Sequence, residues 1–161
     1  MEAMNKVRGI AHDRNVAKVT VVGVPDRPGI ASTIFDSLAK ANISVDTIVQ
    51  NASIDHITDL TFTVARSDLS KAMKVMGPVV KSIGARECVG DSKLAKVSVV
   101  GAGMQTAPGY AARMFNALYE SGINIELITT SEIRITCLID EERTNDAVRA
   151  LHKAFELEKA L

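Results

Sequence analysis

An internal repeat constrains the fold of this chain more than any other feature of its sequence. Residues 17–24 (AKVTVVGV) and 95–102 (AKVSVVGA) agree at six of eight positions, at an offset of 78 residues. The agreement resumes at an offset of 80, where Pro28–Ala31 aligns with Pro108–Ala111. Because self-similarity at a fixed period indicates repeated structural units, the chain divides into two copies of one unit of roughly 65–75 residues.

The first copy shows a fixed order of secondary-structure patterns. β-branched residues at 19–23 indicate a strand, and 25–29 has the composition of a turn. An apolar stripe at helical spacing follows, formed by Ile30, Ile34, Leu38 and Ala39. Strands at 43–49 and 60–64, a helix carrying Leu69 to Met76 and a short apolar segment at 85–89 complete the copy. This βαββαβ order predicts an α+β, ferredoxin-like fold.

The second copy repeats this order but ends before a fourth strand. Its expected elements are strand 96–101, helix 108–121, strands 124–130 and 132–139, and helix 144–155. The strand-like segment 6–11 belongs to neither copy, so we expect it to pair into the second sheet. The first predicted domain is therefore residues 16–91. The second consists of residues 1–15 together with 92–161, so the first domain is inserted in the second.

Composition excludes several classes of function. The 19 basic and 19 acidic residues balance, which removes the electrostatic attraction on which nucleic-acid binding depends. There is no apolar stretch of 18 residues, so no membrane span is expected. Cys88 and Cys137 are isolated within apolar runs. We interpret both as core thiols of a protein in the reducing cytoplasm.

No pattern of catalytic residues is present. The segment Ser98–Gly103 resembles a dinucleotide fingerprint, but Thr106 stands where the third glycine belongs. A phosphate-binding loop with its lysine is absent. The three histidines are His12, His56 and His152, and none of them neighbours a plausible nucleophile. We expect no catalytic residue, no metal site and no cofactor.

The turn at 24–31 is the most informative segment for function. In one interpretation it is a plain strand-to-helix connection, with Asp26 as a turn former. In the other it binds a free amino acid. A ligand carboxylate fits the unpaired amides at the helix start, around Ile30 and Ala31. Asp26 supplies the anion that an α-ammonium group needs.

The end of the next strand lies opposite this turn. There, the amides of Gln50 and Asn51 are placed to recognise a side-chain hydroxyl group. The second copy keeps the proline-glycine turn, but residues 105–107 (QTA) replace the segment that contains Asp26. We therefore expect the two copies to differ in function.

Four segments resemble the paired ACT domains of aspartokinases. They are Pro25–Gly29 (PDRPG), Ile48–Asn51 (IVQN), Lys96–Met104 (KVSVVGAGM) and Asn124–Ile135 (NIELITTSEIRI). The resemblance covers nearly the whole chain and is greatest to the separately translated regulatory β subunit of the hetero-oligomeric enzymes. It implies two tandem ACT domains without the kinase domain.

The resemblance further implies allosteric feedback inhibition of the first step from aspartate towards lysine, threonine and methionine. In this family, threonine or lysine binds where the first unit of one chain meets the second unit of its partner. By matching position, the first unit contributes Asp26, Pro28, Gly29, Ile30, Ala31, Gln50 and Asn51. The second unit contributes Asn124 and Ile125, with Thr130 and Ser131 nearby.

The implied partners are a second copy of the chain and, in the complete enzyme, a catalytic α subunit. A purely structural assembly module that binds no effector is the alternative. Arg27 stands where the family often has lysine, and we expect its side chain to point into solvent.

Overall fold

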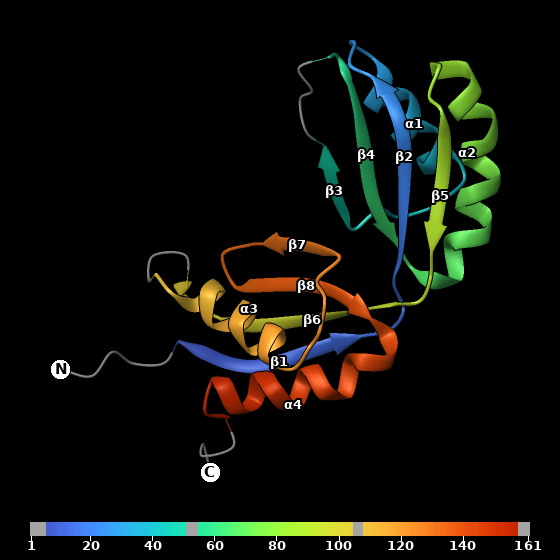
Figure 1. The fold of residues 1–161 in the computed structure, drawn as a ribbon. Coiled ribbons are helices and arrows are strands. Elements are labelled where there is room, and N and C mark those ends of the chain that lie inside the picture. Colours follow the sequence, from blue (N-terminus) through green and yellow to red (C-terminus); the bar gives the residue numbers. More distant parts are fainter. Residues whose placement is uncertain (1–5, 51–54, 105–107, 158–161) are drawn as a thin grey trace. The chain divides into compact units, whose positions relative to one another are not determined.

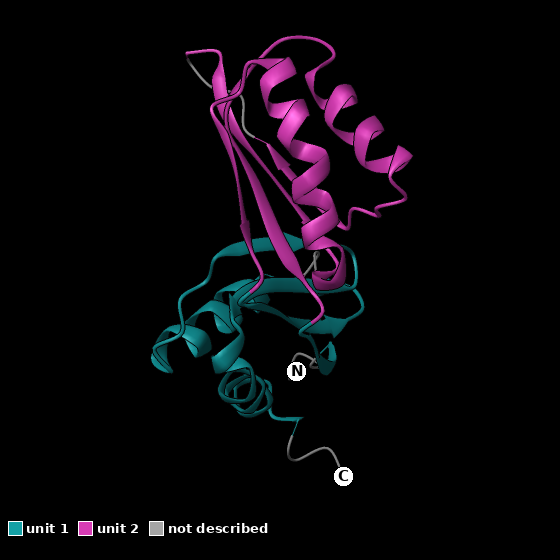
Figure 2. Ribbon diagram, turned by 90° about the vertical axis from the view of Figure 1, so that its right-hand side faces the viewer, with its two compact units in different colours: residues 1–14, 93–161 teal, residues 15–92 magenta. Residues whose placement is uncertain are grey.

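The computed structural model describes residues 6–50, 55–104 and 108–157. The chain forms two compact units, each with one four-stranded antiparallel sheet (Figures 1 and 2). We call residues 15–92 the inner unit, and residues 1–14 together with 93–161 the outer unit. The mixed α+β, ferredoxin-like architecture expected from the repeat is confirmed.

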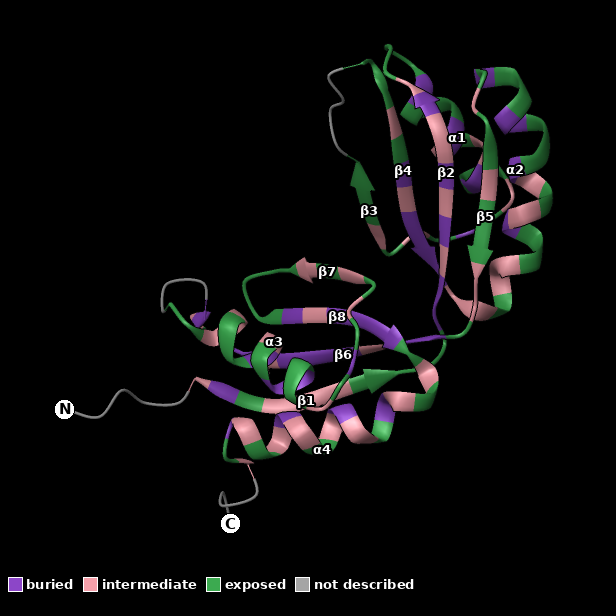
Figure 3. Cartoon of the chain, in the orientation of Figure 1, coloured by how far each residue is buried: buried purple, intermediate pink, exposed green. Residues whose placement is uncertain are grey.

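The sheet of the inner unit has the strand order β3-β4-β2-β5. In chain order its elements are β2 (Ala17–Pro25), α1 (Ile30–Lys40), β3 (Thr47–Gln50), β4 (Ile57–Val64), α2 (Leu69–Ile83) and β5 (Glu87–Asp91). Alternation along the strands separates the two faces of this sheet (Figure 3). Val19 lies opposite Phe62 on the buried face, and Thr20 lies opposite Thr61 on the other face.

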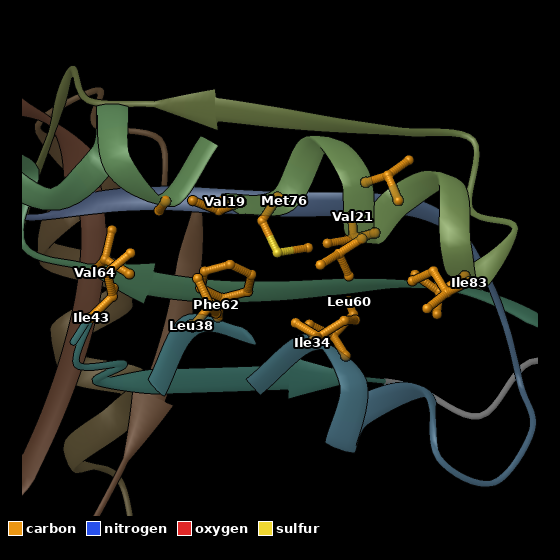
Figure 4. Packing of buried hydrophobic residues seen from close by; sticks show 14 of the residues in the cluster. Val19, Val21, Ile34, Leu38, Ile43, Leu60, Phe62, Val64, Met76 and Ile83 are labelled. Atoms are coloured by element: carbon orange, nitrogen blue, oxygen red, sulfur yellow. The ribbon is translucent and has the colours of Figure 1, made fainter. Parts of the chain in front are cut away.

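Both helices of the inner unit pack against the buried face of its sheet (Figure 4). Ile34 and Leu38 of α1 are fully buried, as the spacing of the apolar stripe predicts. Phe35 meets Phe62 edge to face, with ring centroids 5.7 Å apart. Burying a side chain of this size contributes about 1.5–3 kcal/mol. The core therefore fixes α1, and with it the turn that precedes the helix.

The sheet of the outer unit has the order β1-β6-β8-β7. Its elements are β1 (Val7–Asp13), β6 (Leu94–Gly101), α3 (Tyr110–Glu120), β7 (Leu127–Thr130), β8 (Arg134–Asp140) and α4 (Thr144–Ala154). Strand β1 pairs with β6, as predicted, and supplies the fourth strand that the second copy lacks. Among the helices that the structure describes, none is both long and apolar enough to span a bilayer.

Aromatic residues connect the segment just before β1 with the helices of the outer unit. The Lys6 amide donates to the Tyr110 hydroxyl at 3.1 Å. The Tyr110 ring stacks on Phe155, with centroids 6.4 Å apart and planes 8° from parallel. The Arg113 guanidinium lies 5.4 Å from the centroid of the same Phe155 ring. The residue just before β1 is thus bonded to the start of α3, which in turn stacks on the end of α4.

The two thiols differ in their surroundings. Cys137 is fully buried in the core of the outer unit, and desolvation raises its pKa to about 12. Cys88 is half-buried on β5, where burial also raises the pKa of the thiol. The interpretation of core thiols is therefore confirmed for Cys137, whereas Cys88 packs at the edge of the core.

Candidate functional site

The turn between β2 and α1, together with the first residues of α1, contains most of the effector-binding residues predicted for the first unit. Asp26, Pro28 and Gly29 are exposed, whereas Ile30 is buried and anchors the start of the helix. The Asp26 amide donates to the His56 carbonyl oxygen at 2.7 Å, which ties the turn to the beginning of β4. The Asp26 carboxylate has no hydrogen-bond partner among the described residues, so it is accessible to a cationic ligand.

The start of α1 presents backbone amides. Gly29 precedes the helix with φ of 90°, a left-handed conformation that glycine adopts without strain. The Gly29 carbonyl accepts from the Thr33 amide at 3.0 Å and from the Thr33 hydroxyl at 2.9 Å. No side chain caps the helix, and the amides of Ile30 and Ala31 are unpaired within the described part of the chain. Such a helix start favours an anionic ligand.

Small side chains leave these amides accessible. Ala31 is exposed in the first turn of α1, and Gly29 has open space where a Cβ would lie. Gln50 is exposed at the last position of β3, the edge strand of the same sheet. Asn51 falls outside the described residues.

The expectation for Arg27 needs correction. The residue is exposed, but its side chain does not simply point into solvent. Its guanidinium Nη2 donates to the Ile83 carbonyl oxygen at 3.3 Å. Ile83 is the last residue of α2, so Arg27 connects the turn to the end of the second helix of the inner unit.

The outer unit has a pocket of about 480 Å³ at the corresponding place, the start of α3. It is lined by Met104, Pro108, Gly109, Tyr110, Ala111, Thr130, Ser131, Glu132 and Ile135. Gly109 precedes α3 with φ of 99°, so the helix start repeats the geometry of the inner unit. The predicted residues Thr130 and Ser131 therefore line a pocket of their own unit.

Sequence reasoning predicted only Thr130 and Ser131 among these lining residues, and missed the other seven: Met104, Pro108, Gly109, Tyr110, Ala111, Glu132 and Ile135. The signal was available in the repeat. The offset of 80 residues that aligns the two Pro-Gly turns also places Thr130 and Ser131 at the positions of Gln50 and Asn51. Each site residue predicted around the first Pro-Gly turn thus has an aligned residue around the second Pro-Gly turn.

The remaining two predicted residues lie on the connection between α3 and β7. Asn124 is exposed, and Ile125 is half-buried against the core of the outer unit. Neither contributes to the lining of the pocket at the start of α3. The residues 105–107, which stand in place of the Asp26 segment, lie outside the described residues.

Comparison with known proteins identifies the family. The ACT domain profile matches residues 19–77 and again 97–155. An aspartate kinase of Pseudomonas fluorescens is 52% identical over 152 residues, which cover 94% of this chain and 37% of that protein. The chain thus spans little more than a third of the length of such relatives.

Two solved structures are similar over nearly their whole length. The structure of aspartokinase alpha and beta subunits is 47% identical, with a TM-score of 0.87, over 93% of this chain and 99% of the matched one. The ligand-free regulatory subunit of aspartate kinase from Thermus thermophilus is 39% identical, with a TM-score of 0.88 and the same coverage. The chain therefore belongs to the ACT domain family, as a tandem pair of regulatory ACT domains of aspartokinase.

Proposed function

We propose that this chain binds an amino acid of the aspartate family, threonine or lysine, and transmits feedback inhibition to an aspartate kinase. One observation supports this function above all. An exposed carboxylate, Asp26, lies four residues before Ile30, the start of a helix whose first amides are unpaired in the described structure. The two features match the two charges of an amino-acid zwitterion.

Each part of the ligand has a proposed partner. The effector carboxylate accepts from the amides of Ile30 and Ala31, which the Pro28–Gly29 turn leaves accessible. The effector ammonium pairs with Asp26. Its side chain reaches Gln50, at the end of the edge strand β3, and Asn51.

A second copy of the chain completes the proposed site. The side chains of Ile48 on β3 and Ile128 on β7 are 54% and 46% exposed, on equivalent edge strands of the two sheets. Exposed apolar edges of this kind favour pairing with another chain. In the resulting dimer, the inner unit of one chain faces Asn124, Ile125, Thr130 and Ser131 of the other.

The chain is proposed to act on a catalytic α subunit in the complete enzyme. That subunit phosphorylates the β-carboxylate of aspartate, the first step towards lysine, threonine and methionine. Similarity to the structure of aspartokinase alpha and beta subunits supports this assignment. The chain itself is proposed to be non-catalytic.

The exposed edge strands also suit a second candidate function. An assembly module that holds kinase chains together without binding an effector requires the same apolar edges on β3 and β7. It does not require the Asp26 carboxylate or the open helix start. Measurement of ligand binding therefore separates the two functions.

Isothermal titration calorimetry with threonine and with lysine tests the proposal. We expect saturable binding of at least one of them. Asp26→Ala is expected to weaken this binding by about tenfold to a hundredfold, because a charge-assisted hydrogen bond contributes about 1.5–3 kcal/mol. Asp36→Ala removes an exposed carboxylate from α1, the helix that follows this turn, and serves as the control. If neither threonine nor lysine binds, the assembly module remains as the function.

A further inference from the structure

A β-bulge interrupts β2 just before the proposed effector site. Val21 lies opposite Leu60, but the next paired residue, Val24, lies opposite Thr58. Strand β2 thus contains one more residue than β4 in this interval. The bulge includes Gly23, whose φ of 69° suits glycine far better than other residues.

The bulge is held on both of its sides. On the β4 side, the Asp59 carboxylate accepts from the Gly23 amide at 3.1 Å. On the β5 side, the Arg86 amide donates to the Val22 carbonyl at 2.9 Å. A Cβ on Gly23 would lie 3.0 Å from the Arg86 Cβ, so this side offers little space for rearrangement. Asp59 therefore provides a specific side-chain contact to the backbone of the bulge.

The bulge determines which way the end of β2 faces. In an uninterrupted strand, residues three apart point to opposite faces of the sheet. Here Val21 and Val24 are both fully buried in the core, because the extra residue restores the alternation. Pro25 is the last paired residue, and the Asp26 amide then bonds to His56. The direction in which Asp26 leaves the strand thus depends on the bulge.

The outer unit holds the equivalent segment in another way. Val99 lies opposite Ile135 just as Val21 lies opposite Leu60, so Arg134 occupies the position of Asp59. The Gly101 amide instead donates to the Ile133 carbonyl at 2.9 Å. The carboxylate contact is therefore a feature of the copy that also contains Asp26.

We propose that Asp59 is a positioning residue for the effector site. Its carboxylate fixes the bulge at Gly23, which holds Asp26 and the start of α1 in the arrangement that binds the amino acid. Asp59 acts through the Gly23 amide without contacting the effector. This inference rests on the proposed function, because it concerns the affinity of the same site.

Three variants of the chain separate positioning from a direct effect of charge. Asp59→Ala removes the acceptor, whereas Asp59→Asn keeps an oxygen acceptor without the charge. Glu87→Ala removes an exposed carboxylate from β5, opposite Val22 on the other side of the bulged strand. Each protein is titrated with threonine and lysine by calorimetry. Amide hydrogen exchange at Gly23 and thermal unfolding are measured in parallel.

We expect Asp59→Ala to weaken effector binding by about tenfold and to speed exchange of the Gly23 amide. Asp59→Asn should bind within about threefold of the unsubstituted chain, since a neutral acceptor retains much of the contact. Glu87→Ala should change neither measurement. A merely structural role would lower the unfolding temperature of Asp59→Ala without changing its affinity.

Several results would overturn the inference. If Asp59→Asn lost as much affinity as Asp59→Ala, the charge would act on the ligand directly. Unchanged affinity or unchanged Gly23 exchange in Asp59→Ala would contradict positioning. If the unsubstituted chain bound neither amino acid, the proposed function would fail, and with it the role of Asp59.

Discussion

In the proposed site, the size of the side chain at Ala31 sets how closely a ligand can approach the amides at the start of α1. It is exposed in the first helical turn, so a larger side chain is tolerated by the fold but occupies the space in front of the helix. Ala31→Val should therefore abolish effector binding in calorimetry. Its free energy of unfolding should change by no more than about 0.5 kcal/mol, as is usual for surface substitutions. In the complete enzyme, we expect loss of feedback inhibition with a nearly unchanged uninhibited rate.

Ala111→Val is the matched control in the second copy. Ala111 lines the pocket at the start of α3, where the segment containing Asp26 has no acidic counterpart. This substitution should reduce feedback inhibition less than Ala31→Val does. Equal loss of inhibition would contradict the assignment of the primary site to the inner unit.

Local sequence is sufficient to predict the residues of the first turn, but not the long-range contacts that hold them in place. Pro28, Gly29 and the apolar stripe of α1 are neighbours in sequence, so the turn and the helix start are predictable. Asp59 is 36 positions from Gly23, and nothing in the pattern of β4 distinguishes it from a solvated carboxylate. The contact of Arg27 with Ile83 was missed for the same reason, because it joins residues 56 positions apart.

At the level of elements, Gly101 of β6 lies close to the backbone at the start of β1. A Cβ at this position would collide with the backbone carbonyl oxygen of Lys6, the residue just before β1. Gly101→Ala should therefore destabilise the outer unit by about 1–3 kcal/mol. Urea unfolding measures this change.

Gly9→Ala is the control for the same pair of strands. Gly9 lies on β1 opposite Val100 and has open space where a Cβ would lie. We expect its unfolding free energy to stay within about 0.5 kcal/mol of the unsubstituted value. Equal stability of the two variants would contradict the close backbone approach at Gly101.

Strand β3 shows where periodicity alone is insufficient. The apolar run predicted a strand from residue 43, but β3 begins at Thr47. The Ile43 amide donates to the Leu38 carbonyl at 3.0 Å, so Ile43 belongs to the hydrogen-bonded turn that follows the end of α1. Its buried side chain belongs to the core in either conformation, and a hydrophobicity pattern therefore cannot separate the two. By contrast, the absence of a fourth strand from the second copy correctly predicted that the N-terminal segment joins the second sheet, where β1 pairs with β6.

At the level of the whole molecule, effector binding should be linked to association. We expect the isolated chain to form a dimer in sedimentation experiments. A ligand that binds only the folded, associated form stabilises it by about 2.7 kcal/mol at a hundredfold excess over Kd. Threonine or lysine should therefore raise the melting temperature. A monomer at high concentration, with and without each amino acid, would contradict this assembly.

Amino-acid binding at the start of α1 is tested most directly by an amide NMR titration of the isotope-labelled chain with threonine and with lysine. We predict saturable shifts of the Ile30 and Ala31 amides, with a further shift at Gln50. Asp26→Ala should lose these shifts under the same conditions. The absence of shifts with both amino acids, or shifts confined to Tyr110 and Ala111, would contradict an effector site in the first ACT domain.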